Sequence, residues 1–213
     1  MIVNESKTAL MCFSAAKSFR AEAKLTLAGS EIKSTNTVKL LGVTLNSRCN
    51  FHHHAISVKN KIRAKSWALA KLRRAGMKTD QLIRTYKNLV RPAAEYVVPV
   101  WHSMLTAAQA DLIERQQCQA LKNIFGAGIS ASKLRSMANV RPLSARRRNA
   151  CLKFAQKFLE SDKFNKWFLK RLPANYVRRS NIEYNTFNEP NARADRYRNS
   201  PKVYLTRLLN SNH

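Results

Sequence analysis

Acidic residues are scarce in this chain. It has 12 Asp and Glu against 39 Lys and Arg, a formal net charge of +27 over 213 residues. A domain carrying this charge repels itself unless a polyanion or salt offsets it, and its field attracts nucleic acid or anionic lipid. The hydrophobic fraction of 45% is ordinary for a globular chain. We therefore expect a folded protein with a basic surface rather than a solvated basic tail.

Cysteine pairs and long apolar runs are also missing. The four cysteines are widely scattered, and no two have Cys-x-x-Cys spacing, which excludes a zinc knuckle or a redox pair of that type. The longest apolar stretches, such as residues 97–101, are far shorter than the roughly 20 residues that cross a bilayer. Glu5 and Lys7 stand where a secretory signal would be apolar. We expect an intracellular protein, nuclear or cytoplasmic, that does not enter a membrane.

No catalytic constellation can be found in the sequence. The aspartates are isolated from one another: Asp80, Asp111, Asp162 and Asp195. Two-metal phosphoryl transfer needs carboxylates that converge on ions about 4 Å apart. The sequence also has no Gly-rich phosphate loop and no Gly-x-Ser-x-Gly turn. We therefore expect a chain that is not an enzyme by itself, with no catalytic residue, no bound metal and no cofactor.

The first 48 residues predict a small antiparallel β element. Expected strands cover residues 7–13, 23–27 and 38–45, with a turn at Gly29-Ser30. Two or three strands are marginally stable alone in water, so this element needs a neighbour to pack on.

From residue 53 onward the pattern becomes helical, and the expected fold is mainly α. Helices are expected at 56–74, 79–90, 106–124, 143–160 and 203–209, with a shorter segment at 164–172 and a loop at 174–200. Their boundaries rest on Gly76, on Thr79, on a Thr106–Gln109 capping box and on prolines, with Pro92 at a kink or a boundary. We expect three domains: a β element (1–48), a helical domain (49–130) and a basic helical extension (131–213).

The helix expected at 56–74 has two contrasting faces. Its apolar stripe contains Val58, Ile62, Leu69 and Leu72. The opposite face carries Lys59, Arg63, Trp67, Lys71 and Arg74. Asp80 is the sole acid within residues 32–94, so the basic face has no partner in the surrounding sequence. The face predicts a nucleic-acid backbone contact with Trp67 against a sugar or base. The alternative is a solvated face with Trp67 folded back onto the core.

Two further clusters of like residues need an interpretation. Arg146, Arg147 and Arg148 open the helix at 143–160, where cations oppose the helix dipole. This unfavourable interaction with the dipole suggests that an anionic partner compensates it. A solubilising or localisation patch explains the cluster equally well. His52-His53-His54 is not expected to bind metal, because adjacent histidines point apart. A capping or packing role at the helix entrance is expected instead.

Eight short pieces, in order, resemble the C-terminal part of the reverse transcriptase of non-LTR (LINE-type) retrotransposons. The most specific are Leu72-Arg73-Arg74-Ala75-Gly76 and Val90-Arg91-Pro92-x-x-Glu95-Tyr96-x-x-Pro99-Val100-Trp101. The others are Asn4-x-x-Lys7-Thr8, Leu41-Gly42-Val43, Phe51-x-x-His54, Gln116 with Ala120 and Leu121, Arg196 to Pro201, and Arg207 to Asn210.

The resemblance implies the end of a palm, a helical thumb and a C-terminal helical extension. It implies that Lys7 occupies the position of a motif lysine near the incoming nucleotide, and that Leu41 and Gly42 occupy a primer-grip turn. The family copies RNA into DNA with magnesium. The family's fingers and its Tyr-x-Asp-Asp turn have no counterpart in this sequence, so no catalytic residue is carried over.

Three functions remain open at this point. The first is a truncated reverse-transcriptase-like protein that binds RNA, DNA or an RNA–DNA hybrid through backbone contacts. The second is a non-catalytic module that docks onto an intact polymerase such as a full-length element protein, or a decayed fragment without function. The third is binding to anionic membranes, which the narrow apolar stripe of the basic helix disfavours.

Overall fold

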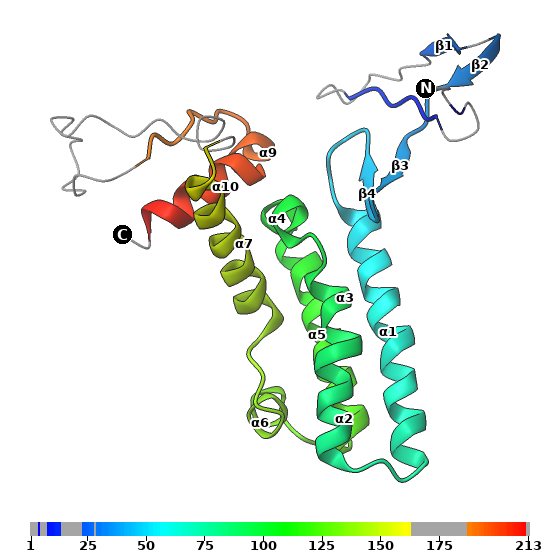
Figure 1. Cartoon of the computed structure of the whole chain (residues 1–213), viewed down its shortest axis with the longest axis vertical. Coiled ribbons are helices and arrows are strands. Elements are labelled where there is room, and N and C mark those ends of the chain that lie inside the picture. Colours follow the sequence, from blue (N-terminus) through cyan, green and yellow to red (C-terminus); the bar gives the residue numbers. More distant parts are fainter. Residues whose placement is uncertain (1–3, 5–7, 14–22, 28, 163–186, 212–213) are drawn as a thin grey trace, which may run out of the picture.

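The computed structural model describes residues 4, 8–13, 23–27, 29–162 and 187–211. Two small β-hairpins come first, and the rest of the described chain is helical (Figure 1). The predicted fold class, mainly α with a small N-terminal antiparallel β element, is confirmed.

The β part consists of two separate antiparallel pairs. β1 (Lys24–Leu27) pairs with β2 (Ser30–Lys33), and β3 (Thr37–Leu40) pairs with β4 (Val43–Asn46). The strand expected at 23–27 is therefore confirmed, but the single strand expected at 38–45 is wrong. The chain reverses at Leu41 and Gly42, whose φ angles of 45° and 82° give the left-handed backbone of a two-residue hairpin turn.

The strand expected at 7–13 does not form over the part that the structure describes. Within residues 8–13 the pairing is limited to an isolated bridge between Leu10 and Ser34. The motif position Lys7 lies outside the described residues. A single bridge leaves most backbone groups of a strand unpaired, so this segment adds little to the sheet.

Helix α1 (His52–Arg74) begins one residue before position 53, where the sequence pattern becomes helical, directly below the second hairpin. The side chain of His54 is buried, and its Nδ1 accepts a hydrogen bond from the backbone N–H of Thr44 at 3.3 Å. The His54 ring also contacts Trp101 edge to face, with ring centroids 5.2 Å apart. The last histidine of the triplet therefore packs β4 onto the helices, as the sequence analysis expected of a packing residue.

The far end of α1 closes as expected at Gly76. This glycine has a φ of 83°, its N–H donates to the carbonyl of Arg73, and the N–H of Met77 donates to the carbonyl of Leu72. This bonding is the Schellman motif, in which the glycine adopts a left-handed conformation without steric cost.

The helix expected at 79–90 continues further and changes its winding. α2 (Thr79–Thr85) passes into a π-helical turn, η2 (Tyr86–Val90), and then into α3 (Arg91–Glu95). Pro92 has no N–H to donate to the preceding turn, and the wider π turn lies directly before it. Thr79 is the first helical residue rather than the N-cap, which is Lys78. The backbone N–H of Lys78 donates to the side chain of Gln81.

A short helix and a 3₁₀ turn, α4 (Val98–Trp101) and η3 (His102–Met104), lead into α5 (Ala107–Phe125). The capping box between Thr106 and Gln109 is confirmed. α5 packs along α1, and the two are linked by a hydrogen bond of 2.9 Å from the Asn123 amide to the carbonyl of Ser66.

The sequence analysis missed α6 (Ala131–Met137). In the described part of the chain, three helices follow it. They are α7 (Leu143–Glu160), α9 (Asp195–Arg198) and α10 (Pro201–Asn210). α10 packs on α7, and one hydrophobic core runs from β4 through α1 and α5 to α10. The segment expected at 164–172 lies outside the described residues.

Leu69 sits in the core between α1 and its neighbours and is fully buried. We expect Leu69→Ala to lower the free energy of unfolding by about 2 to 5 kcal/mol, because it removes apolar contacts and leaves a cavity. Leu89 is 41% exposed, and Leu89→Ala should cost at most about 0.5 kcal/mol. Urea denaturation followed by circular dichroism measures both, and equal losses would contradict this core assignment.

Candidate nucleic-acid interface

The basic face predicted on α1 lies on the protein surface. Arg63, Lys71 and Arg74 are exposed, and Lys59 is half-buried. Trp67 is 60% exposed, so the alternative in which this ring folds back onto the core is wrong. Trp67 cannot reach the core because it lies on the opposite side of α1 from the buried residues Val58, Ile62 and Leu69.

Trp67 is held in place by one of the cations beside it. The Nζ atom of Lys71 lies 3.7 Å from the centre of the Trp67 ring system, a cation–π contact one helical turn along α1. The contact orients the indole while more than half of the side chain stays open to solvent. An aromatic surface flanked by cations is what sugar and base stacking requires.

The charge of this face is not neutralised by nearby acids. Among the ion pairs between described residues, none involves a side chain of α1. Lys59 and Arg74 are 15 positions apart on the helix, which corresponds to about 22 Å at 1.5 Å per residue. The face therefore forms a straight basic strip as long as roughly six nucleotide steps of a duplex strand.

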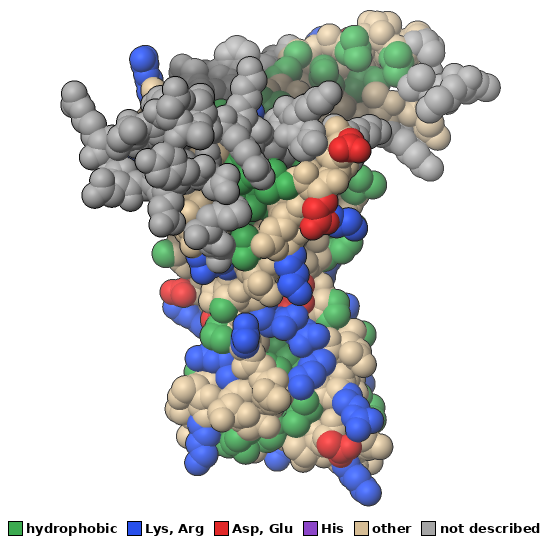
Figure 2. All heavy atoms as spheres, turned by 60° about the vertical axis from the view of Figure 1, so that its left-hand side comes forward, with side chains coloured by type: hydrophobic (Ala, Val, Ile, Leu, Met, Phe, Trp, Pro, Cys, Tyr) green, Lys and Arg blue, Asp and Glu red, His purple; other side chains and the backbone are tan. Residues whose placement is uncertain are grey.

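Positive charge is not confined to α1. Figure 2 shows the side of the molecule on which α6 and α7 lie, where Lys and Arg side chains outnumber acidic ones. The exposed basic residues of that region are Lys133, Arg141, Arg148, Lys153 and Lys157. What distinguishes α1 is the combination of aligned cations with an exposed aromatic ring.

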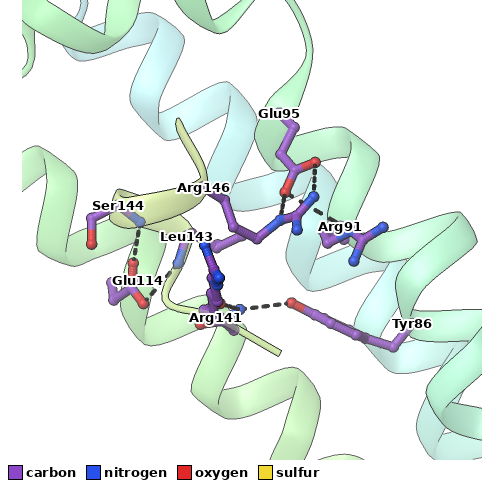
Figure 3. A network of polar contacts seen from close by, with 9 residues as sticks. Tyr86, Arg91, Glu95, Glu114, Arg141, Leu143, Ser144 and Arg146 are labelled. Carbon is purple, nitrogen blue, oxygen red and sulfur yellow. Dashed lines mark hydrogen bonds and ion pairs between the residues drawn. The ribbon is translucent and has the colours of Figure 1, made fainter. Parts of the chain in front are cut away.

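The three consecutive arginines of α7 have three different environments. Arg146 forms a two-pronged ion pair with Glu95 of α3, which raises the pKa of Arg146 (Figure 3). Arg147 is fully buried, 6.0 Å from the Trp101 ring centre, and burial lowers the pKa of its guanidinium. Arg148 is exposed. The structure therefore removes Arg147 from the predicted binding residues, occupies Arg146 with an internal partner and leaves Arg148 available.

The N-terminus of α7 is compensated from within the protein. The carboxylate of Glu114 on α5 accepts hydrogen bonds from the backbone N–H groups of Leu143 and Ser144, both at 3.1 Å, as Figure 3 shows. It also lies 3.8 Å from the guanidinium of Arg135. A negative charge at a helix N-terminus offsets the dipole that the arginines oppose. The inference that this cluster lacks compensation was wrong, because Glu114 lies 29 residues away in sequence.

The turn at Leu41 and Gly42 rests against α3. The hydroxyl of Tyr96 donates to the carbonyl oxygen of Leu41 at 3.1 Å. A Cβ added to Gly42 would lie 3.1 Å from a ring carbon of Tyr96, and the φ of 82° disfavours any other residue. The motif with Leu41 and Gly42 and the motif with Tyr96, both of which resemble the reverse-transcriptase family, therefore contact each other although they are 55 residues apart in sequence.

Within the described residues, no group of three or more His, Cys, Asp or Glu side chains could hold a metal ion. No helix of the described part is both long enough and apolar enough to cross a bilayer. Comparisons with protein-family models, with curated proteins and with solved structures found no match.

Burial makes the fold sensitive to acid at His54. It lowers the pKa of His54 from 6.5 to about 4, and the charge of Lys61 adds to the effect. Between these pH values the unfolded chain binds a proton that the folded chain does not, so stability falls by about 1.4 kcal/mol per pH unit as pH drops from 6.5 towards 4. His102, whose pKa burial also lowers from 6.5 to about 4, contributes a slope of the same size over this range. His54→Asn can keep an acceptor for the Thr44 N–H and should therefore reduce the combined slope by about half. Unfolding titrations from pH 7 to 5 test this, and an unchanged slope in the variant would refute it.

Glu114 offers a second test of the internal network. Glu114→Gln keeps the shape of the side chain but removes the charge that caps α7 and pairs with Arg135. We expect a loss of about 1 to 2 kcal/mol in the free energy of unfolding. Glu160→Gln, at the exposed end of the same α7, is the matched control and should change it by less than about 0.5 kcal/mol. Equal effects of the two changes would argue against the cap.

Proposed function

We propose that this chain is the thumb-like part of a retroelement reverse transcriptase, and that it binds the sugar–phosphate backbone of nucleic acid without catalysing synthesis. The observation that carries the proposal is the basic face of α1. Four cations and an exposed tryptophan follow one side of a 23-residue helix, and none of them forms an ion pair with a described residue.

Binding through this face would be electrostatic and independent of base sequence. Each Lys or Arg that neutralises a phosphate releases counterions, which steepens the salt dependence by about 0.9 log unit for duplex DNA. Contacts with phosphates position a protein on a strand but do not read its bases. RNA, DNA and RNA–DNA hybrids are therefore all candidate ligands.

The arrangement of the resembling motifs supports the choice of family. Leu41 and Gly42 pack on Tyr96, and Glu95 of the same motif pairs with Arg146. Trp101 at the end of that motif is fully buried, and its indole N–H donates to the carbonyl of Tyr96 at 3.0 Å. Residues that the resemblance picks out thus support one another structurally.

The proposed role is binding rather than chemistry. The aspartates of the sequence are isolated, and none matches the Tyr-x-Asp-Asp motif of the family. Nucleotide transfer with magnesium would require a palm with that motif, which these 213 residues do not contain. A full-length polymerase of the same element type is a candidate partner.

Docking onto such a polymerase is the second candidate function. Apolar side chains of the two hairpins are exposed: Leu25 at 46%, Leu40 at 57% and Leu41 at 82%. Leu40 and Leu41 are adjacent at the turn of the β3–β4 hairpin, whereas Leu25 lies on the separate β1–β2 hairpin. Exposed apolar surface of this kind can mark an interaction site. Co-purification with a full-length element protein that is lost in Leu40→Ser/Leu41→Ser would support this function.

The binding proposal is tested with a triple charge reversal on α1. In filter binding to an RNA–DNA hybrid, the unmodified chain should lose affinity steeply as salt rises. Lys59→Glu/Arg63→Glu/Lys71→Glu should weaken binding and reduce the slope of log affinity against log salt by about 2 to 3. Trp67→Ala should weaken binding without changing the slope, because it removes stacking and not charge.

The matched control reverses three exposed lysines elsewhere, Lys133→Glu/Lys153→Glu/Lys157→Glu. This variant has the same net charge as the α1 variant, so a difference between the two isolates the site from the overall field. If both triple variants bind alike, the α1 face is not the interface. If the unmodified chain ignores polynucleotides in near-salt-free buffer, the proposed function is wrong.

A further inference from the structure

A half-open cavity of about 550 Å³ lies at the surface where α1 and α3 pack together, on a different side of α1 from the basic face. Its walls are mainly apolar and come from Val58 on α1 and from Pro92 and Ala93 on α3. Tyr96, which is 53% exposed, lines it as well and presents an aromatic ring. This volume is within the range of sites for small organic ligands.

Two lysines give this apolar cavity a positive edge. Lys61 and Lys65 lie one turn apart on α1, and both line the cavity. His54 is also in the lining; burial lowers its pKa, and the nearby charge of Lys61 adds to the effect. No Asp or Glu is among the lining residues. Glu95, the neighbour of Tyr96 in sequence, is engaged by Arg91 and Arg146 instead.

The cavity is separate from the strip proposed to bind a strand. At 100° per residue, Lys61 and Arg63 differ by about 200° around the helix axis. Lys61 and Lys65 flank α3, whereas Arg63 and Trp67 project from the far side of α1. A strand that follows the basic face therefore does not need this cavity.

The chemistry of the lining selects the ligand. An uncharged apolar ligand would make no ion pair with the two lysines. A small inorganic anion would leave the apolar walls of the cavity in contact with water. The cavity favours a molecule with a flat aromatic face for stacking and a doubly charged anionic group at one end. A nucleoside monophosphate combines these features, because any base can stack on an aromatic ring and its phosphate matches two cations.

We propose that the α1–α3 cavity binds a nucleotide, with the base between Tyr96 and the Pro92–Ala93 wall and the phosphate between Lys61 and Lys65. The nucleotide is either free or the phosphorylated end of a strand. This site goes beyond the proposed strand binding, and neither activity requires the other.

Calorimetric titration of the full chain with AMP tests the proposal, and ribose 5-phosphate and inorganic phosphate serve as comparison ligands. We expect saturable binding of AMP and at least about tenfold weaker binding of both comparison ligands, since they lack the base. Lys61→Gln/Lys65→Gln should weaken AMP binding about tenfold or more. Lys59→Gln/Lys71→Gln, with the same loss of charge on the basic face, should leave it unchanged.

Filling the cavity gives an independent variant. Ala93→Phe should abolish AMP binding while strand binding in the filter assay persists. If Ala93→Phe fails to fold, the Lys61→Gln/Lys65→Gln variant, which changes side chains outside the core, still tests the site. Displacement of AMP by a 5′-phosphorylated oligonucleotide, but not by its 5′-hydroxyl form, would support the strand end as ligand. AMP binding without such displacement would support a free nucleotide.

Three results would overturn the proposal. One is absence of saturable AMP binding. Another is equal affinity for AMP and inorganic phosphate, which would leave only a charge effect. The third is tighter binding of a long-chain carboxylate than of AMP, which would assign the cavity to an apolar chain. Because strand binding is measured separately with the α1 variants, failure of either activity does not imply failure of the other.

Discussion

Two carboxylates fasten the helices of this basic protein to one another. Glu114 of α5 holds the backbone of the first turn of α7, and Glu95 of α3 holds Arg146 one turn further along. Hydrogen bonds to charged groups contribute about 1.5 to 3 kcal/mol each. Without them α7 would present three arginines at its positive end to the rest of a chain that already carries +27. The position of α7, and of α10 packed on it, depends on these contacts.

The positions of the acidic residues also explain why the basic face of α1 is not neutralised. Among the described residues, Glu95, Glu114 and Glu189 are paired with arginines at contacts between elements, whereas no acid pairs with α1. Two acids, Glu95 and Glu114, are therefore engaged where helices meet, and the ion pairs among the described residues leave the cations of α1 available to solvent or a ligand. A basic strip on a rigid helix and a lysine-edged apolar cavity on its other side are both consequences of this distribution.

Local signals in the sequence predicted many of the helix boundaries. The Thr106–Gln109 box and the left-handed Gly76 depend on contacts within one helical turn, and the structure has both. The stripe of Val58, Ile62 and Leu69 is buried as its periodicity indicated. The strand pattern missed the hairpin turn at Leu41 and Gly42, which only the family resemblance implied, because the β-forming residues on both sides read as one continuous strand. The π turn before Pro92 was missed for a similar reason, since helical periodicity continues through it.

By itself the sequence determined that the chain is mainly helical, that its surface is strongly basic and that α1 has one apolar and one basic face. Tertiary structure alone decided that Arg147 is buried, that Arg146 is paired, that Trp67 is exposed and that residues of α1 and α3 together line a cavity. The physical reason is the range of the interactions. Periodicity and caps act within a few residues of the chain, whereas burial and ion pairing depend on side chains from helices far apart in the sequence.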